Sequence, residues 1–137
     1  MFKARLLKEN DYEQLVDWWK FWRFPAPPKE CLPDNGTCGL MITKDGIDIC
    51  AGFIYFTNSK IAWIEFIVSN PDYKAKDRQN AIEILITELS NIISNKDYHI
   101  IFTSLKNENL INRFKNCGFV KGTGGSTEMV LKVKAPN

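Results

Sequence analysis

The sequence predicts an α+β protein in which helices pack against a mixed sheet, in the order β-α-β-β-β-α-β-α-β. Two observations predict this class: some segments repeat their apolar residues every three or four positions, whereas others alternate or are continuously apolar between turn residues. The length of 137 residues, with 45% hydrophobic and 25% charged side chains, is typical of one domain with a single core. We therefore expect one domain that spans residues 1–137.

The first part of the chain predicts a strand, a helix and a loop. Residues 3–7 alternate as in a short strand, and Asn10-Asp11-Tyr12-Glu13 offers a helix N-cap with an acidic first turn. Prolines at positions 25, 27 and 28 forbid the helix from continuing. The segment 24–37 is therefore predicted to be a loop, or a loop with one helical turn.

This first helix is rich in aromatic residues. Its spacing places Trp18 and Trp22 on one face with Leu15, where they are predicted to lie in the core, and leaves Trp19 and Phe21 exposed. Exposed aromatic residues beside a proline loop suit a peptide, a flat amine or a second copy of the chain, as in a homodimer. The sequence does not choose among these.

The middle of the chain predicts three strands and the longest helix. Segments 39–43 and 47–56 form a hairpin through Lys44-Asp45-Gly46, and 61–69 is the next strand. Apolar residues between Ala81 and Ile93 keep a period of 3.6, which predicts a helix from residue 76 or 77 to residue 93.

The last part predicts two more strands around a short helix. Segment 98–103 is typical of a buried strand, and Asn107 caps a helix that ends at Cys117-Gly118. Segment 128–133 is predicted to be the final strand. The glycine-rich loop at 121–126 precedes a strand and not a helix, so the pattern favours a hairpin over a phosphate site.

Composition excludes several classes of function. A formal net charge of +2 is too small for non-specific nucleic-acid binding, and no apolar run approaches the roughly 20 residues that span a bilayer. We expect a cytoplasmic protein without a membrane partner. Cysteines 31, 38, 50 and 117 lack Cys-x-x-Cys spacing, so we interpret them as small buried hydrophobic residues and predict no metal site.

The turn between segment 61–69 and the long helix carries the strongest functional signal. After Pro71 the chain enters a basic stretch that contains Lys74, Lys76 and Arg78 and opens the helix. Unpaired amides and the helix dipole attract anions to such an N-terminus, and the three cations strengthen the attraction. The turn therefore predicts a site for a phosphorylated ligand, although it contains no glycine.

Nearly the whole chain, from about residue 4 to residue 133, resembles the GNAT superfamily of acyl-CoA-dependent N-acyltransferases. In that family, the fourth strand ends in a proline corner, and the signature Arg/Gln-x-x-Gly-x-Gly/Ala that follows it binds the CoA pyrophosphate. Here the corner corresponds to Pro71-Asp72-Tyr73. The signature corresponds to Lys74-Ala75-Lys76-Asp77-Arg78-Gln79. Asn107, with Phe114 seven residues later and Gly118-Phe119 beyond it, resembles the family's second hallmark. Ala51-Gly52-Phe53 resembles its central hairpin. The resemblance implies a GNAT-like, mostly antiparallel sheet.

The basic turn departs from the family pattern at three positions. Lys74 stands for Arg or Gln, Asp77 for the first glycine and Gln79 for Gly or Ala. A carboxylate at roughly 4 Å from a phosphate would cost about 4 kcal/mol at an effective dielectric constant near 20. The Asp77 carboxylate must therefore point elsewhere, be neutralised, or cap the helix and consume amide donors.

The resemblance implies a set of site residues, with acetyl-CoA as co-substrate. Glu65 is the acidic residue inside the fourth strand and is the candidate general base. Phe114 replaces the tyrosine that often protonates the departing thiolate, so a phenol would have to come from Tyr55, Tyr73 or Tyr98. The residues expected to bind the cofactor are Ile67, Val68, Ser69, Lys74, Ala75, Lys76, Asp77, Arg78, Gln79, Asn80 and Asn107.

The resemblance favours an N-acetyltransferase that moves an acetyl group from acetyl-CoA directly to a primary amine. The acceptor would be a small amine or an amine of a peptide or protein. One alternative is a non-catalytic GNAT-fold binding or interaction module, which the residues at positions 77, 79 and 114 favour. A single-strand nucleic-acid binder is a third reading, weakened by the small net charge.

Overall fold

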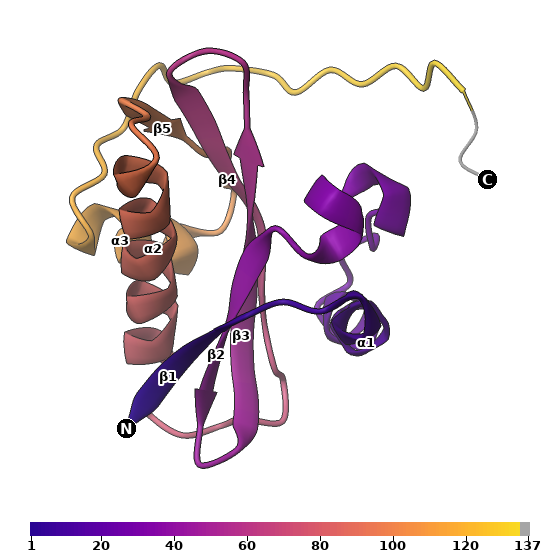
Figure 1. Cartoon of the computed structure of the whole chain (residues 1–137), viewed down its shortest axis with the longest axis vertical. Helices are drawn as coiled ribbons and strands as arrows, with labels where there is room; N and C mark the ends of the chain where they lie inside the picture. Colours follow the sequence, from indigo (N-terminus) through magenta and orange to yellow (C-terminus); the bar gives the residue numbers. More distant parts are fainter. Residues whose placement is uncertain (135–137) are drawn as a thin grey trace.

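A five-stranded sheet runs through the middle of the protein, and helices cover both of its faces (Figure 1). The computed structural model describes residues 1–134. The strands follow each other in the order β1-β2-β3-β4-β5, with antiparallel neighbours except for the parallel pair β4 and β5. The strands are β1 (Phe2–Leu6), β2 (Gly39–Lys44), β3 (Ile47–Phe56), β4 (Ile61–Ser69) and β5 (Ile100–Phe102). The predicted α+β class with a mostly antiparallel sheet is confirmed.

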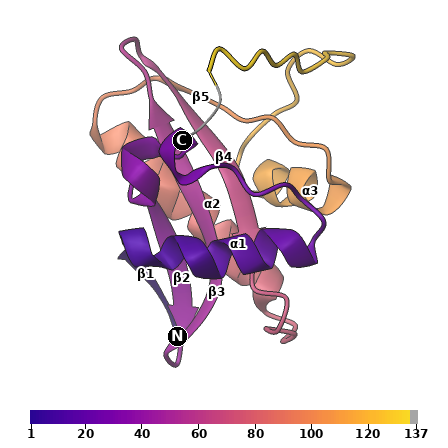
Figure 2. The same cartoon turned by 90° about the vertical axis from the view of Figure 1, so that its right-hand side faces the viewer.

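Three α-helices form the two outer layers. The pair α2 and α3 lies on one face of the sheet, and α1 lies on the other with the loop that follows it (Figures 1 and 2). The helices are α1 (Tyr12–Phe21), α2 (Arg78–Asn95) and α3 (Glu108–Asn116). Short 3-10 turns precede and follow α1, namely η1 (Glu9–Asp11), η2 (Lys29–Cys31) and η3 (Pro33–Gly36).

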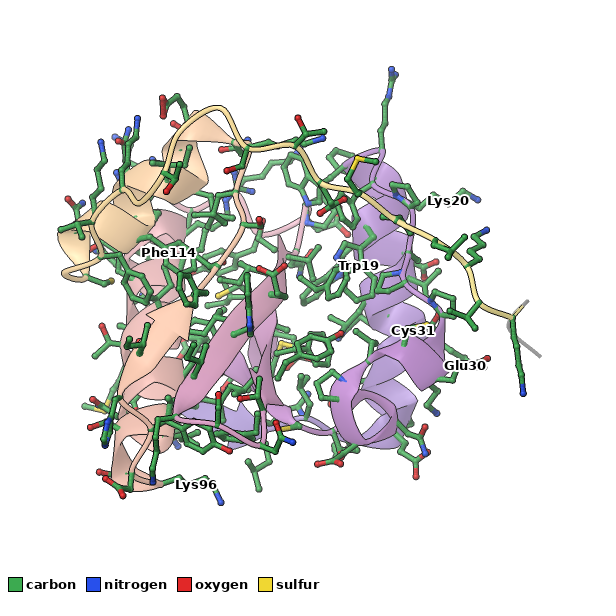
Figure 3. The ribbon with its side chains drawn as sticks, turned by 90° about the horizontal axis from the view of Figure 1, so that it is seen from above. Trp19, Lys20, Glu30, Cys31, Lys96 and Phe114 are labelled. Atoms are coloured by element: carbon green, nitrogen blue, oxygen red, sulfur yellow. The ribbon has the colours of Figure 1, made fainter. Side chains whose placement is uncertain are left out.

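Each face of the sheet has its own apolar core. On one side Leu85 of α2 and Phe114 of α3 pack against Ile64, and on the other Trp19 stacks on Phe53 with ring centroids 6.3 Å apart. Figure 3 shows Phe114 and Trp19 on opposite sides of the sheet. Burying a side chain of this size contributes about 1.5–3 kcal/mol, so the sheet is held rigidly between its helical layers.

The β2–β3 hairpin has the turn that its sequence predicts. Asp45 and Gly46 have φ angles of 53° and 78°, and this pair of left-handed residues matches the twist of the two strands. Lys44, the last residue of β2, is thereby placed at the same end of the sheet as the turn between β4 and α2 (Figure 1).

Strand β4 contains a bulge at Phe66. Ala51 pairs with Val68 and Phe53 pairs with Glu65, so β4 has one residue more than β3 between these pairs, and Phe66 has a φ of 58°. Phe66 consequently packs against the core under α1. Regular alternation along β4 predicts that Phe66 lies on the same face as Ile64. The extra residue reverses the alternation from this point, so that prediction is wrong.

Strands β4 and β5 pair over only a few residues. Their register joins Ile61 with Ile100 and Trp63 with Phe102, and β5 ends there. Within residues 1–134, the second half of β4 pairs with β3 on one side, and no strand continues the sheet on its other side. The edge of β4 from the bulge to Ser69 therefore opens towards the α2 N-terminus.

The final strand predicted at 128–133 does not form. These residues have no strand assignment, and Met129, Val130, Leu131 and Val133 are exposed. The segment beyond α3 runs along the outside of the molecule (Figure 1). An alternating apolar pattern gives strand propensity, but a strand needs a paired neighbour, and none is formed here.

The predicted exposures of the α1 tryptophans are partly wrong. Trp18 is buried as expected, but Trp19 is only 1% exposed and Trp22 is 44% exposed. Helix α1 ends at Phe21, and Arg23 has a φ of 58°. Trp22 therefore lies outside the helical periodicity on which its prediction rested.

The cysteines also differ from their predicted burial. Cys50 is fully buried, whereas Cys31 is exposed and the other two are intermediate. Burial strongly raises the pKa of the Cys50 thiol. Only Cys50 therefore fits the interpretation of a small core residue.

Candidate functional site

The site begins at the corner where β4 ends. The Asn70 side chain holds this corner, because its amide nitrogen donates to the Asp48 carbonyl at 2.9 Å and its oxygen accepts from the Asp72 amide at 2.8 Å. Helix α2 starts at Arg78, with Asp77 at the N-cap position. The helix begins one or two residues later than predicted, and residues 74–77 form the turn that leads into it.

The Asp77 side chain turns away from the helix amides. One carboxylate oxygen accepts from Lys44 Nζ at 2.6 Å and the other from the Tyr73 hydroxyl at 2.7 Å. These two hydrogen bonds, the one from Lys44 first, lower the pKa of Asp77. The φ of Asp77 is −84°, so its backbone has no left-handed strain. Of the outcomes considered above, the carboxylate is both turned away and neutralised.

The first turn of α2 keeps two of its amide donors. The Asp77 side chain makes no capping hydrogen bond, so it does not occupy the amides of Gln79 and Asn80, whereas the Arg78 amide donates to the Ala75 carbonyl at 3.2 Å. The side chains of Lys74 and Lys76 are exposed beside them. This end of the helix thus combines backbone donors with positive charge, which suits an anion.

Trp22 links α1 to this end of the site. Its indole nitrogen donates to the Ser69 carbonyl at 2.8 Å, and the Arg78 guanidinium carbon lies 5.6 Å from the centroid of its ring. Trp22 therefore lies between the end of β4 and the start of α2. The sequence pattern predicts a core position for Trp22, so its place at this site could not be read from the sequence.

Glu65 lies before the β4 bulge on the face covered by α1. One oxygen accepts hydrogen bonds from the Ser104 amide at 3.0 Å and the Thr103 hydroxyl at 3.1 Å. Burial raises the pKa of Glu65, the two hydrogen bonds partly oppose this rise, and the Glu128 carboxylate adds to it. A carboxylate with a raised pKa that is held in a fixed position can accept and release protons.

A cavity of about 350 Å³ opens beside Glu65. Its other lining residues are Tyr55, Trp63 and Phe66. Phe66 reaches it only because of the bulge, so sequence alternation could not have placed it there.

The tyrosines considered as thiolate acids are engaged elsewhere. The hydroxyls of Tyr55, Tyr73 and Tyr98 donate to the Cys31 carbonyl, the Asp77 carboxylate and the Thr57 carbonyl, respectively. Burial raises the pKa of Tyr55 to about 12. Phe114 is buried under α3 and carries no hydroxyl. Each of the three hydroxyl groups therefore already donates a hydrogen bond within the protein.

Asn107 has the role of a helix cap. Its side-chain oxygen accepts from the Leu110 amide at 3.0 Å at the start of α3. Asn107 lies on the segment between β5 and α3. A further contact with a cofactor would use its remaining amide nitrogen.

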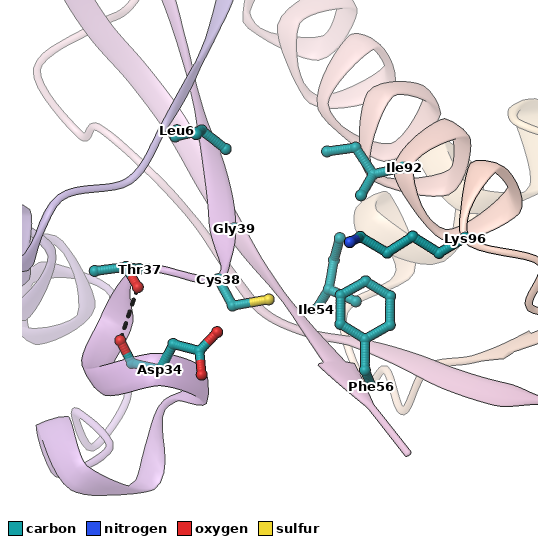
Figure 4. A pocket seen from close by; sticks show the side chains of 9 residues that line it. All are labelled: Leu6, Asp34, Thr37, Cys38, Gly39, Ile54, Phe56, Ile92 and Lys96. Atoms are coloured by element: carbon teal, nitrogen blue, oxygen red, sulfur yellow. Dashed lines mark hydrogen bonds between the residues drawn. The ribbon is translucent and has the colours of Figure 1, made fainter. Parts of the chain in front are cut away.

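A second cavity, of about 310 Å³, lies between η3 and the C-terminal end of α2 (Figure 4). The thiol of Cys38 and the amine of Lys96 point into it, and the loop above it is held by a hydrogen bond from the Thr37 hydroxyl to the Asp34 carbonyl. None of the residues predicted for cofactor binding or catalysis lines this cavity.

The described residues contain neither a membrane-spanning helix nor a cluster of metal-binding side chains. No helix within residues 1–134 has the length and apolar character needed to cross a membrane. No group of three or more His, Cys, Asp or Glu side chains in the same part of the chain could hold a metal ion.

Solved structures of acetyltransferases are similar to this chain over almost its whole length. The ribosomal-protein-S18-alanine N-acetyltransferase from Escherichia coli matches with a TM-score of 0.72 and 16% identity, over 90% of this chain and 80% of that chain. An acetyltransferase from Trypanosoma brucei matches with a TM-score of 0.62 and 17% identity, over 97% and 100%. An aminoglycoside acetyltransferase from an uncultured soil metagenomic sample, crystallised with sisomicin, matches with a TM-score of 0.61 and 11% identity, over 96% and 97%.

Sequence comparison adds nothing to these matches, because no protein-family model and no curated protein sequence matches the chain. At identities of 11–17%, the likeness shows the fold.

Proposed function

Because the chain has the GNAT fold, we propose that it is an N-acetyltransferase that uses acetyl-CoA as co-substrate and a primary amine as acceptor. The observation that carries the proposal is the Asp77 side chain, which pairs with Lys44 and Tyr73 and leaves the amides of Gln79 and Asn80 to an anion. The pyrophosphate would bind the turn at residues 74–80, and the pantetheine arm would lie along the open β4 edge at residues 67–69.

The proposed chemistry is a direct transfer. Glu65 removes a proton from the acceptor ammonium, and the free amine attacks the thioester carbonyl. A C–N bond forms and the C–S bond breaks. The attacking nitrogen releases its extra proton to water, and the departing thiolate takes a proton from water. The cavity beside Glu65 supports this assignment, because it gives an amine access to the carboxylate.

Thermal melting tests cofactor binding. Acetyl-CoA at about 100 times its dissociation constant is expected to add roughly 2.7 kcal/mol of stability. The variant with Lys74→Ala and Arg78→Ala is expected to bind acetyl-CoA at least about tenfold more weakly, because two cations beside the phosphates are removed. Isothermal titration calorimetry measures the affinity.

A control pair removes the same charge elsewhere. Lys3→Ala with Lys121→Ala changes two exposed lysines distant in sequence from the turn and should leave the affinity unchanged. Absence of any melting shift at millimolar acetyl-CoA would contradict the proposed function. An unchanged affinity of the Lys74 and Arg78 variant would show that the pyrophosphate binds elsewhere.

The Lys44–Asp77 pair gives a second prediction. Lys44→Ala leaves the Asp77 carboxylate without its cation, so the affinity for acetyl-CoA is expected to fall by roughly three- to tenfold through repulsion of the phosphates. Asp77→Asn added to Lys44→Ala should restore most of it. Calorimetry on the single and double variants measures the coupling, and an equal loss in both would contradict the proposed role of the pair.

The same pair predicts a dependence of stability on pH. The pKa of Asp77 is lowered in the folded protein, so its ionised form contributes stability above the ordinary aspartate pKa. This contribution is lost as the pH falls through the lowered pKa. In urea unfolding, Lys44→Ala should therefore reduce the loss of stability on acidification.

A further inference from the structure

An aromatic row crosses three strands on the face of the sheet that α1 covers. Tyr55 of β3 pairs in register with Trp63 of β4, which pairs with Phe102 of β5. Paired residues of neighbouring strands point to the same face. The rings of Trp63 and Phe102 are stacked, with centroids 5.2 Å apart and an interplanar angle of 29°.

Two members of this row are open to solvent. Trp63 is 36% exposed and Phe102 is 45% exposed. Large aromatic side chains at the open end of a sheet expose apolar area that a ligand can cover. The row therefore offers a flat apolar surface next to the proposed site of chemistry.

Glu65 provides the polar end of this surface. It is two residues beyond Trp63 on β4, which corresponds to a separation of roughly 6.5 Å along an extended strand. Phe66 also lines this surface, with its ring centroid 6.2 Å from that of Tyr55. The cavity of about 350 Å³ beside Glu65 is thus lined by three aromatic side chains and one carboxylate.

This lining discriminates between classes of amine. One carboxylate matches one ammonium group, and aromatic faces favour rings and cations. A polyamine or an aminoglycoside would bring further cations that no second lining carboxylate can pair. Among the described residues that line the cavity, no cation is present to pair with an acidic acceptor.

From this arrangement we propose that the acceptor is an arylalkylamine, that is, a single primary amine joined to a flat aromatic ring by a short chain. This inference rests on the proposed acetyltransferase function. The ring stacks on Trp63 and Phe102, and the amine lies at Glu65. The spacing along β4 fits a linker of two or three carbons between ring and nitrogen.

A panel of acceptors tests the inference with acetyl-CoA and the full chain. 2-Phenylethylamine and tryptamine are expected to have a kcat/KM at least about tenfold higher than those of spermidine, sisomicin and a peptide with an N-terminal alanine. Release of the CoA thiol measures the rate. A higher value for any of the last three acceptors would overturn the inference.

Variants of the aromatic row test whether these side chains bind the acceptor or only support the fold. Trp63→Leu and, separately, Phe102→Leu are expected to raise the KM for 2-phenylethylamine about tenfold. Leu6→Ala removes an exposed apolar side chain from β1, at the opposite edge of the sheet, and should leave KM unchanged. If both row variants fold, as judged by circular dichroism, and keep the wild-type KM, the inference is overturned.

Failure of the inference can be distinguished from failure of the proposed function. Stabilisation by acetyl-CoA without acetylation of any arylalkylamine would overturn the acceptor class and leave cofactor binding intact. Absence of stabilisation by acetyl-CoA would overturn both.

Discussion

Replacing Glu65 by glutamine is expected to lower kcat by about 10²–10⁴-fold, the contribution typical of a general base, while acetyl-CoA binds as before. Glutamine keeps the size of the side chain and can still accept hydrogen bonds from Ser104 and Thr103 through its oxygen. It cannot take a proton from an ammonium group. Steady-state kinetics and calorimetry measure the two quantities separately.

The pH profile of the wild type gives an independent signature of this residue. Burial raises the pKa of Glu65, so its basic form is lost at a higher pH than for an ordinary glutamate. The rate should therefore rise with pH through this raised pKa on the acidic side of the profile. In Glu65→Gln this rise should disappear, because the titrating group is absent.

Glu88→Gln is a matched control. Glu88 is exposed on α2, which lies on the opposite face of the sheet, so the same chemical change there should leave kcat and its pH profile unaltered. A wild-type kcat for Glu65→Gln would exclude Glu65 as the base. A common loss of activity in both variants would equally exclude a specific role.

Gly39→Ala is expected to have the largest effect on stability, lowering the free energy of unfolding by about 3 kcal/mol or more. A Cβ at this position would lie 2.1 Å from the backbone oxygen of Gly52 and 2.9 Å from a methyl carbon of Leu7. The obstacle is backbone of the adjacent strand, so relief requires β2 and β3 to separate. Urea unfolding followed by circular dichroism measures the loss.

Gly122→Ala provides the comparison for this prediction. A Cβ at Gly122 would meet no atom within 4 Å, so its stability should remain within about 0.5 kcal/mol of the wild type. Equal stability of the two variants would show that β2 and β3 do not approach as closely at Gly39 as the structure has it.

The local sequence pattern was sufficient to predict those elements that are stabilised mainly by contacts among their own residues. The period of 3.6 between Ala81 and Ile93 predicts α2, and Asp45-Gly46 predicts the β2–β3 turn. Asn107 caps α3 as predicted, because a cap needs only an amide three residues away. In each case, the deciding contacts are local.

Local pattern failed where the outcome depends on a partner distant in the sequence. Residues 128–133 have the composition of a strand, yet they stay unpaired, since pairing requires a neighbour that the pattern does not specify. The bulge at Phe66 depends on how β4 matches β3, and it reverses the face on which the later residues lie. Trp19, four residues after Leu15, is buried because α1 packs it against Phe53 of β3. Trp22 is exposed because the helix ends at Phe21, so the helical period no longer applies to it.

The order of the elements from β1 to α3, the resemblance to an acetyltransferase family and a basic turn at the start of α2 can all be read from the sequence. The direction in which the Asp77 side chain of that turn points depends instead on tertiary contacts. Lys44 lies 33 residues before Asp77 in the chain, and the hairpin brings its amine to 2.6 Å from the carboxylate. The charge of Asp77 is compensated by a cation that only the folding of the sheet brings near, so no local motif could have revealed it.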